Sequence, residues 1–186
     1  MKAEVGHFLL AVGLLLAVLV GIAGYYYRRS RRTSRTSWEQ LLGQLAYVDR
    51  NCVERIALDA IDESGQRRKD EAAMELEPDE IWQLIGGLKG VEAVERNSLV
   101  FIDMAFYLQR WYPQALVTAE ELRLNAREIE WQVSRLRSAE KTGKLAISFA
   151  SYAQNAVVTY YIMTRRLLAL YELGDLSMLV DLQKSI

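Results

Sequence analysis

Residues 118–136 read TAEELRLNAREIEWQVSRL, and the spacing of their apolar side chains indicates the fold class. Thr118 followed by Glu121 has the pattern of a capping box, which predicts that a helix begins at Thr118. Beyond that start, apolar residues recur at steps of four and three, as in a helix that packs along one seam. They are Leu122, Ala126, Ile129, Val133 and Leu136. The stretch therefore predicts an amphipathic helix packed against other helices.

Helical spacing also dominates toward the N-terminus. Residues 37–62 begin with Ser37 followed by Gln40, another capping box, and continue with one apolar stripe. The stripe consists of Trp38, Leu41, Leu45, Val48, Cys52 and Ile56. We therefore expect one helix to run through this segment. Residues 62–77 lose the stripe and carry dense charge of both signs, which indicates a surface loop or a frayed helix.

A short helix is predicted to begin at Pro78, because proline suits the first turn of a helix. Asp79 and Glu80 follow it, and their charges suit the positive end of the helix dipole. A glycine-rich hinge then interrupts the helix. It consists of Gly86, Gly87 and Gly90.

The next predicted helix runs from about Val91 to Tyr112 and has apolar side chains on more than one face, which indicates a central position. One row consists of Val91, Val94, Phe101, Ala105, Leu108 and Tyr112, and a second row consists of Leu99, Ile102 and Phe106. Pro113 ends this helix.

A long helix is predicted over residues 144–173, and a short last helix follows it. No charged residue occurs between Leu145 and Thr164, so this segment is either a buried bundle helix or a second membrane span. We favour the buried helix, because a span would carry one flanking basic pair across the membrane and would place Gln154 and Asn155 near its centre. Together these segments predict an all-α protein with a bundle of five to six helices.

An apolar run near the N-terminus predicts a single transmembrane helix over residues 8–27. Every residue from Phe8 to Ala23 is apolar or glycine. At about 1.5 Å per residue the twenty-residue run reaches roughly 30 Å, the thickness of a bilayer's hydrocarbon core. The alternative is a cleaved signal peptide, because small residues precede Gly24. The basic residues that follow the run favour a retained anchor.

A basic collar follows the apolar run and predicts the orientation of the chain. The membrane-interface residues are Tyr25, Tyr26, Tyr27, Arg28, Arg29, Arg31, Arg32 and Arg35. Tyrosines favour the headgroup zone, and the arginines attract anionic headgroups. Because positive residues resist translocation, we expect residues 1–7 to form an extracytoplasmic tail and residues 28–37 a juxtamembrane tether. Residues 38–186 would then be an acidic helical-bundle domain in the cytoplasm, with a prokaryotic inner membrane as the expected location.

Charge and histidine content argue against several functions for the bundle. Residues 1–37 hold six Lys and Arg against Glu4, whereas the whole chain has a formal net charge of −1, so residues 38–186 are acidic. An acidic domain does not favour nucleic-acid binding. The one histidine, His7, precedes the anchor, which removes Ser-His and Cys-His pairs and histidine metal ligands from the bundle. We therefore expect no catalytic, cofactor or metal site.

Two side chains are nevertheless candidates for chemistry. Cys52 lies on an apolar stripe, so we interpret it as a small core residue in preference to a nucleophile. Asp103 is the only charge in residues 99–108 and is a candidate buried charge, with a pKa that burial would shift. Arg96 and Arg110 lie seven residues to either side of it, so a solvated or ion-paired stripe is the alternative.

Trp131 is the strongest candidate for protein recognition. It lies off the apolar seam on a face that it shares with Leu124, and Arg127 and Arg135 frame it four residues to either side. An exposed tryptophan framed by arginines is typical of a binding hot spot, and arginine stacks on such rings. In the alternative interpretation, a neighbouring helix covers Trp131.

These features predict a non-enzymatic, single-pass membrane protein that acts as a scaffold, an adaptor or an accessory subunit. We expect its bundle to bind a protein partner that belongs to a membrane complex. The alternative is a membrane-proximal enzyme or lipid-handling domain that uses carboxylates in a pocket between helices. A deep pocket lined by convergent carboxylates, Asp103 among them, would favour the alternative.

Overall fold

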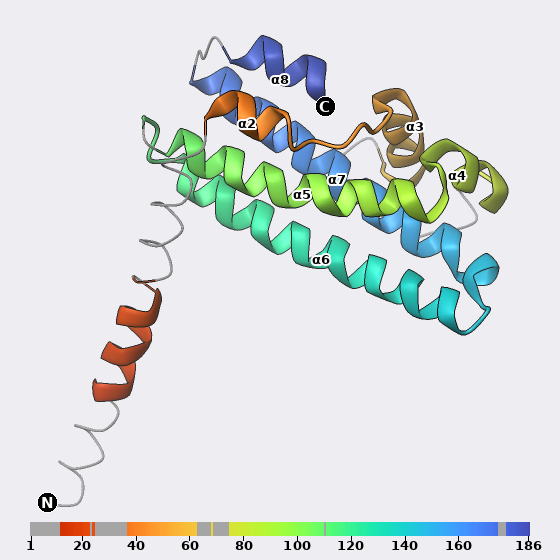
Figure 1. Ribbon diagram of the computed structural model, residues 1–186, viewed down its shortest axis with the longest axis horizontal. Coiled ribbons are helices and arrows are strands. Elements are labelled where there is room, and N and C mark those ends of the chain that lie inside the picture. Colours follow the sequence, from red (N-terminus) through yellow and green to blue (C-terminus); the bar gives the residue numbers. More distant parts are fainter. Residues whose placement is uncertain are drawn as a thin grey trace, which may run out of the picture. The chain divides into compact units, whose positions relative to one another are not determined.

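The computed structural model describes residues 12–22, 24, 37–62, 68, 75–109, 111–174 and 178–186. The chain divides into two units, Met1–Ser37 and Trp38–Ile186. The second unit is a helical bundle, as Figure 1 shows. Its helices are α2 (Trp38–Leu42), α3 (Arg50–Ala60), α4 (Pro78–Ile85), α5 (Gly87–Leu108), α6 (Ala115–Lys141), α7 (Leu145–Leu173) and α8 (Leu179–Ser185). The all-α class and the bundle are confirmed.

The predicted helix count was too low, because the described part of the bundle holds seven helices where five to six were expected. Residues 37–62 do not form one helix: α2 ends at Leu42 and α3 begins at Arg50. In and after the linker between them, backbone N–H groups donate to side chains, where a continuous helix would pair them with backbone carbonyls. The Ala46 N–H donates to Asn97 Oδ1 at 2.8 Å, and the Asp49 side chain caps α3 by accepting from the Asn51 and Cys52 N–H groups.

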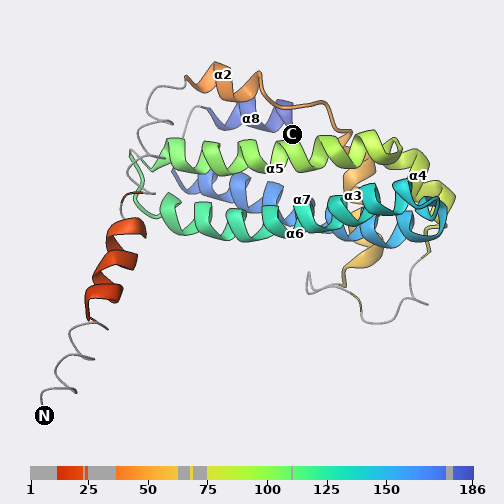
Figure 2. The same ribbon diagram turned by 60° about the horizontal axis from the view of Figure 1, so that its bottom comes forward.

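Three long helices, α5, α6 and α7, run alongside one another and form the centre of the bundle (Figures 1 and 2). The predicted seam of α6 is confirmed, because all five of its side chains are buried. The predicted start of α6 is wrong, since the helix begins at Ala115 and Thr118 lies inside it. Pro113 begins a series of turns, in which the Leu116 N–H donates to the Pro113 carbonyl, and the helix continues directly from them.

Helix α7 packs against α3, α4, α5, α6 and α8, so the uncharged segment from Leu145 to Thr164 lies within the bundle. Its polar residue Gln154 is 7% exposed. The side-chain amide of Gln154 donates from Nε2 to Asp59 Oδ2 at 3.0 Å, which satisfies the buried group.

The glycine-rich segment forms the corner between α4 and α5. Gly86 and Gly87 have φ angles of 78° and 65°, which favour glycine. A Cβ atom at Gly90 would collide with the backbone oxygen of Ile85. Helix α4 begins at Pro78 as predicted, with a capping box between Glu77 and Glu80.

The two apolar rows predicted for α5 are mostly buried. In the second row Ile102 and Phe106 are buried, but Leu99 is 55% exposed. The buried part of this row is therefore shorter than expected. The helix ends at Leu108, four residues before the predicted end at Tyr112.

The unit Met1–Ser37 contains helical residues 12–22, whose leucine side chains are exposed. Among the described residues, no helix combines the length and the apolar character needed to cross a membrane. The predicted anchor over residues 8–27 is described only at residues 12–22 and 24. His7 and the interface residues Tyr25, Tyr26, Tyr27, Arg28, Arg29, Arg31, Arg32 and Arg35 lie outside the described residues.

Candidate functional site

The residues predicted for partner binding come together on the outer face of α6. Leu124 is 59% exposed, Trp131 is 50% exposed, and Arg127 and Arg135 are also exposed. At about 100° per residue, these four side chains lie on the opposite side of α6 from the buried seam. We call this surface, formed by Leu124, Arg127, Trp131 and Arg135, the Trp131 face.

Trp131 is partly covered, because its ring contacts Arg135 of the same helix and Tyr152 of α7. The Arg135 guanidinium carbon lies 5.0 Å from the ring centroid, in the range of a cation–π contact. The Tyr152 ring of α7 meets the Trp131 ring edge-on, with 5.9 Å between centroids and an interplanar angle of 74°. A neighbouring helix therefore covers part of Trp131, and half of the residue stays open to solvent.

The arginines of the Trp131 face differ from the other arginines of α6. Arg123 pairs with Glu120 at 2.7 Å, and Arg137 bridges to Glu92 and Glu95 on α5. Within the described residues, Arg127 and Arg135 form no ion pair. Two guanidinium groups beside an exposed tryptophan are thus available to carboxylates from outside the chain.

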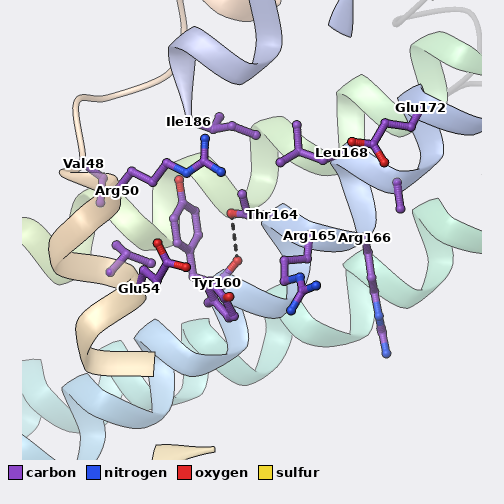
Figure 3. Close-up of a pocket in the computed structure, with 13 residues that line it drawn as sticks. Val48, Arg50, Glu54, Tyr160, Thr164, Arg165, Arg166, Leu168, Glu172 and Ile186 are labelled. Atoms are coloured by element: carbon purple, nitrogen blue, oxygen red, sulfur yellow. Dashed lines mark hydrogen bonds between the residues drawn. The ribbon is translucent and has the colours of Figure 1, made fainter. Parts of the chain in front are cut away.

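A second surface feature is a groove of about 640 Å³ between α3, α7 and the C-terminal residue Ile186 (Figure 3). Charged residues of both signs line it, together with apolar side chains such as Val53 and Leu168. The charged residues are Arg50, Glu54, Arg165, Arg166 and Glu172. Asp103, the carboxylate that the sequence suggested for a pocket between helices, is not part of the lining.

Tyr160 closes the inner wall of this groove and is 3% exposed. Its hydroxyl accepts a hydrogen bond from Asn97 Nδ2 at 3.3 Å, and its ring stacks on Phe101 with 5.2 Å between centroids. Burial raises the pKa of Tyr160 to about 12, so the phenol is neutral at physiological pH. Tyr160 is therefore suited to support the groove and does not supply a charge to it.

The two other candidates for chemistry are less buried than expected. Asp103 is half-buried on α5, and so does not fit the prediction of a buried charge. Its predicted neighbour Arg96 is exposed, and Arg110 lies outside the described residues. Cys52 is also half-buried and is not a core residue. Burial, followed by the nearby Asp49 carboxylate, raises the pKa of the Cys52 thiol, which disfavours the nucleophilic thiolate.

The groove was not predicted from the sequence. Its walls come from residues 48–54 and 160–172, which no periodicity or short motif connects. Among the described residues, no three His, Cys, Asp or Glu side chains are grouped so that they could hold a metal ion. Comparisons with protein-family models, with curated proteins and with solved structures found no match to this chain.

Proposed function

We propose that this chain is a single-pass membrane protein whose helical bundle binds a protein partner, as a scaffold, an adaptor or an accessory subunit of a membrane complex. The bundle would lie on the cytoplasmic side, with residues 1–7 outside and the basic collar against anionic headgroups. A prokaryotic inner membrane is the proposed location. No enzymatic activity is part of this proposal.

The anchor is proposed from the apolar sequence of residues 8–27 and from the arginines that follow it. Residues 12–22 are helical, and their exposed side chains, such as Leu14 and Val20, are the apolar surface that lipid would surround in this proposal. A helix that is apolar on every side is stable where lipid or protein surrounds it.

The observation that carries the partner-binding function is the half-exposed Trp131 with Arg135 over its ring. Tryptophan and arginine dominate the binding energy of many interfaces, because both bury large areas and make directional contacts. Leu124 extends the apolar surface by two turns of α6, and Arg127 adds a second cation without an ion pair in the described residues.

Co-purification of the tagged full-length chain in mild detergent tests the partner-binding function. We expect a polypeptide to be recovered with the wild-type chain at a fixed ratio, as a second copy or a different protein. Leu124→Ser and Trp131→Ser should each reduce that ratio at least tenfold. The matched controls are Ile147→Ser and Leu173→Ser, which change residues that are 87% and 74% exposed elsewhere in the bundle.

Recovery of the wild-type chain as a lone monomer would contradict the partner-binding function. The orientation is tested separately by protease added outside sealed cells. We expect the protease to leave residues 38–186 intact, and digestion of the bundle would overturn the proposed topology.

The groove favours a second candidate function, that of a lipid-handling domain. Arg50 and Arg165 at the groove form no ion pair in the described residues, and apolar Val53 and Leu168 lie beside them. Such a lining would suit an anionic lipid. Native mass spectrometry with anionic lipid would detect binding that Arg165→Glu removes and that Trp131→Ser leaves unchanged.

A further inference from the structure

The corner between α5 and α6 carries exposed aromatic and apolar side chains at one end of the bundle. Trp111 is 59% exposed, and Val117, in the first turn of α6, is 65% exposed. Tyr112 between them is half-buried. Residues 104–119 contain no acidic residue, and Arg110 is their one charged residue. We call residues 111–117 the aromatic corner.

The chain enters the bundle beside the aromatic corner. Trp38 is the first residue of the bundle unit, and its ring centroid lies 5.9 Å from that of Tyr107. The Tyr107 ring in turn meets the Trp111 ring, with 5.3 Å between centroids. Trp38 also lies 5.3 Å from Tyr171, near the end of α7. The end of α5, the start of α6 and the end of α7 lie together at this end of the bundle (Figures 1 and 2).

The length of the tether brings this end of the bundle close to the proposed membrane. Residues 28–37 are ten residues, which reach at most about 35 Å when fully extended. Five of them are arginines, whose attraction to anionic headgroups shortens the separation. The opposite end of the bundle lies a full length of α6 away, about 40 Å for its 27 residues. The anchor therefore holds the bundle by the end that carries the aromatic corner.

We infer that the aromatic corner docks on the headgroup layer of the membrane in which residues 8–27 are anchored. This inference rests on the proposed anchor. Tryptophan and tyrosine favour the headgroup zone, because each has an apolar ring and one polar group. Val117 adds apolar surface, and Arg110 has the charge that anionic headgroups attract.

The backbone of the aromatic corner is suited to an environment with less water. An N–H group without a partner would be costly there. Pro113 has no N–H group. The other paired N–H groups of the corner donate to backbone carbonyls within the chain at 2.9–3.1 Å, and they are those of Trp111, Tyr112, Ala115, Leu116 and Val117. These groups need no water when the corner meets lipid.

The neighbouring end of α7 sets a limit to the contact. Arg166 pairs with Glu121 at 3.6 Å across the antiparallel helices α6 and α7, so Leu173 lies near the level of residue 114. Leu173 is 74% exposed, but the exposed Glu172 precedes it. Anionic headgroups would repel the Glu172 carboxylate. The contact with lipid therefore centres on the aromatic corner and not on the end of α7.

Quenching by nitroxide-labelled lipid tests the inference with the full-length chain alone in vesicles of phosphatidylethanolamine and phosphatidylglycerol. Cys52→Ser removes the only cysteine, and Gln114→Cys then allows a fluorescent label at an exposed position of the corner. Nitroxide at the headgroups of both leaflets should quench this label roughly twofold or more. A label at Ile147→Cys, in the first turn of α7 at the opposite end, should be unaffected.

A matched pair of charged variants tests whether the apolar surface makes the contact. Val117 and Ile147 are each the third residue of a long helix and are 65% and 87% exposed. A carboxylate in the first turn of a helix suits its dipole, so both Val117→Glu and Ile147→Glu should fold. Val117→Glu should lower the quenching at residue 114 roughly twofold or more, because anionic headgroups repel it. Ile147→Glu should leave that quenching unchanged, and equal quenching in the two variants would overturn the inference.

A label in the anchor separates this inference from the proposed function. Nitroxide deep in the acyl chains should quench a label at Val18→Cys, near the middle of residues 8–27. Quenching at residue 18 but not at residue 114 would overturn the docking and leave the anchor standing. A corner that binds protein in place of lipid would give the same result, since the vesicles hold no other protein. Quenching at neither residue would overturn both, and quenching at residues 114 and 147 alike would show that the bundle does not dock by one end.

Discussion

Asn97 forms a pair of hydrogen bonds with the backbone of Ala46, which lies 51 residues earlier in the chain. Asn97 Oδ1 accepts from the Ala46 N–H at 2.8 Å, and Asn97 Nδ2 donates to the Ala46 carbonyl at 2.9 Å. The pair fixes the linker between α2 and α3 against α5. Asn97 itself is 1% exposed, so water does not substitute for it easily.

Asn97→Ala should therefore lower the free energy of unfolding by about 2–3 kcal/mol, because it leaves both backbone groups of Ala46 without their partners. Chemical denaturation measures the change. Tyr47→Ala, at a residue of the same linker that is 88% exposed, is the control and should stay within about 0.5 kcal/mol of wild type. Equal stability of the two variants would show that the linker is not held through Asn97.

The raised pKa of Tyr160 predicts a loss of stability at alkaline pH. The ordinary tyrosine pKa is 10.0 and burial raises that of Tyr160 to about 12, so between these values the folded state keeps a proton that the unfolded state loses. The contribution is fully present below pH 10 and is lost as pH rises toward 12. Two pKa units correspond to about 3 kcal/mol. Buried Tyr171, whose pKa is also raised by burial, adds to the loss.

Tyr160→Phe should remove part of this pH dependence. Denaturation at a series of pH values from 8 to 12 should give a shallower decline for the variant than for wild type, with the steepest remaining part due to Tyr171. Parallel curves for the two proteins would contradict the buried state of the Tyr160 hydroxyl.

Core and surface positions of α6 should respond differently to truncation. Ile129 is 0% exposed, so Ile129→Ala should cost about 2–5 kcal/mol through lost burial and the cavity left behind. Trp131→Ser should cost about 1 kcal/mol, because half of the residue is already in water and its contact with Arg135 is exposed. Thermal unfolding compares the two. A larger loss for Trp131→Ser would mean that Trp131 supports the bundle itself.

The corner between α4 and α5 predicts unequal effects of two glycine substitutions. Gly86→Ala introduces a Cβ into open space and costs about 1–2 kcal/mol, because of its positive φ. Gly90→Ala should cost about 3 kcal/mol or more, since its Cβ would collide with the Ile85 carbonyl and the backbone must shift. Denaturant midpoints of the two variants test the order, and a milder effect of Gly90→Ala would contradict the close packing of the corner.

The features that local spacing determines were predictable from the sequence. The seam of α6, the start of α4 at Pro78 and the end of α7 at Leu173 depend on residues within one or two helical turns. The exposure of Leu124 and Trp131 also follows from the helical period, because both lie opposite the seam.

The features that depend on distant residues were not predictable in this way. The apolar stripe of residues 37–62 continues through the linker, and its interruption depends on Asn97, which lies in another helix. The groove was missed for the same reason, since α3 and α7 are far apart in the sequence. Asp103 stands alone among apolar neighbours in the sequence, and only the packing around α5 shows that it is half-buried.

The many contacts of α7 have a consequence for synthesis on the ribosome. Helix α3 buries its apolar side against α7, but about 85 residues separate the end of α3 from the start of α7. At elongation rates of about 5–20 residues per second, α3 waits on the order of ten seconds for that partner. During this interval Ala57 and Ala60 have no Val158 of α7 to cover them, and the nascent chain exposes an apolar surface that a chaperone can bind.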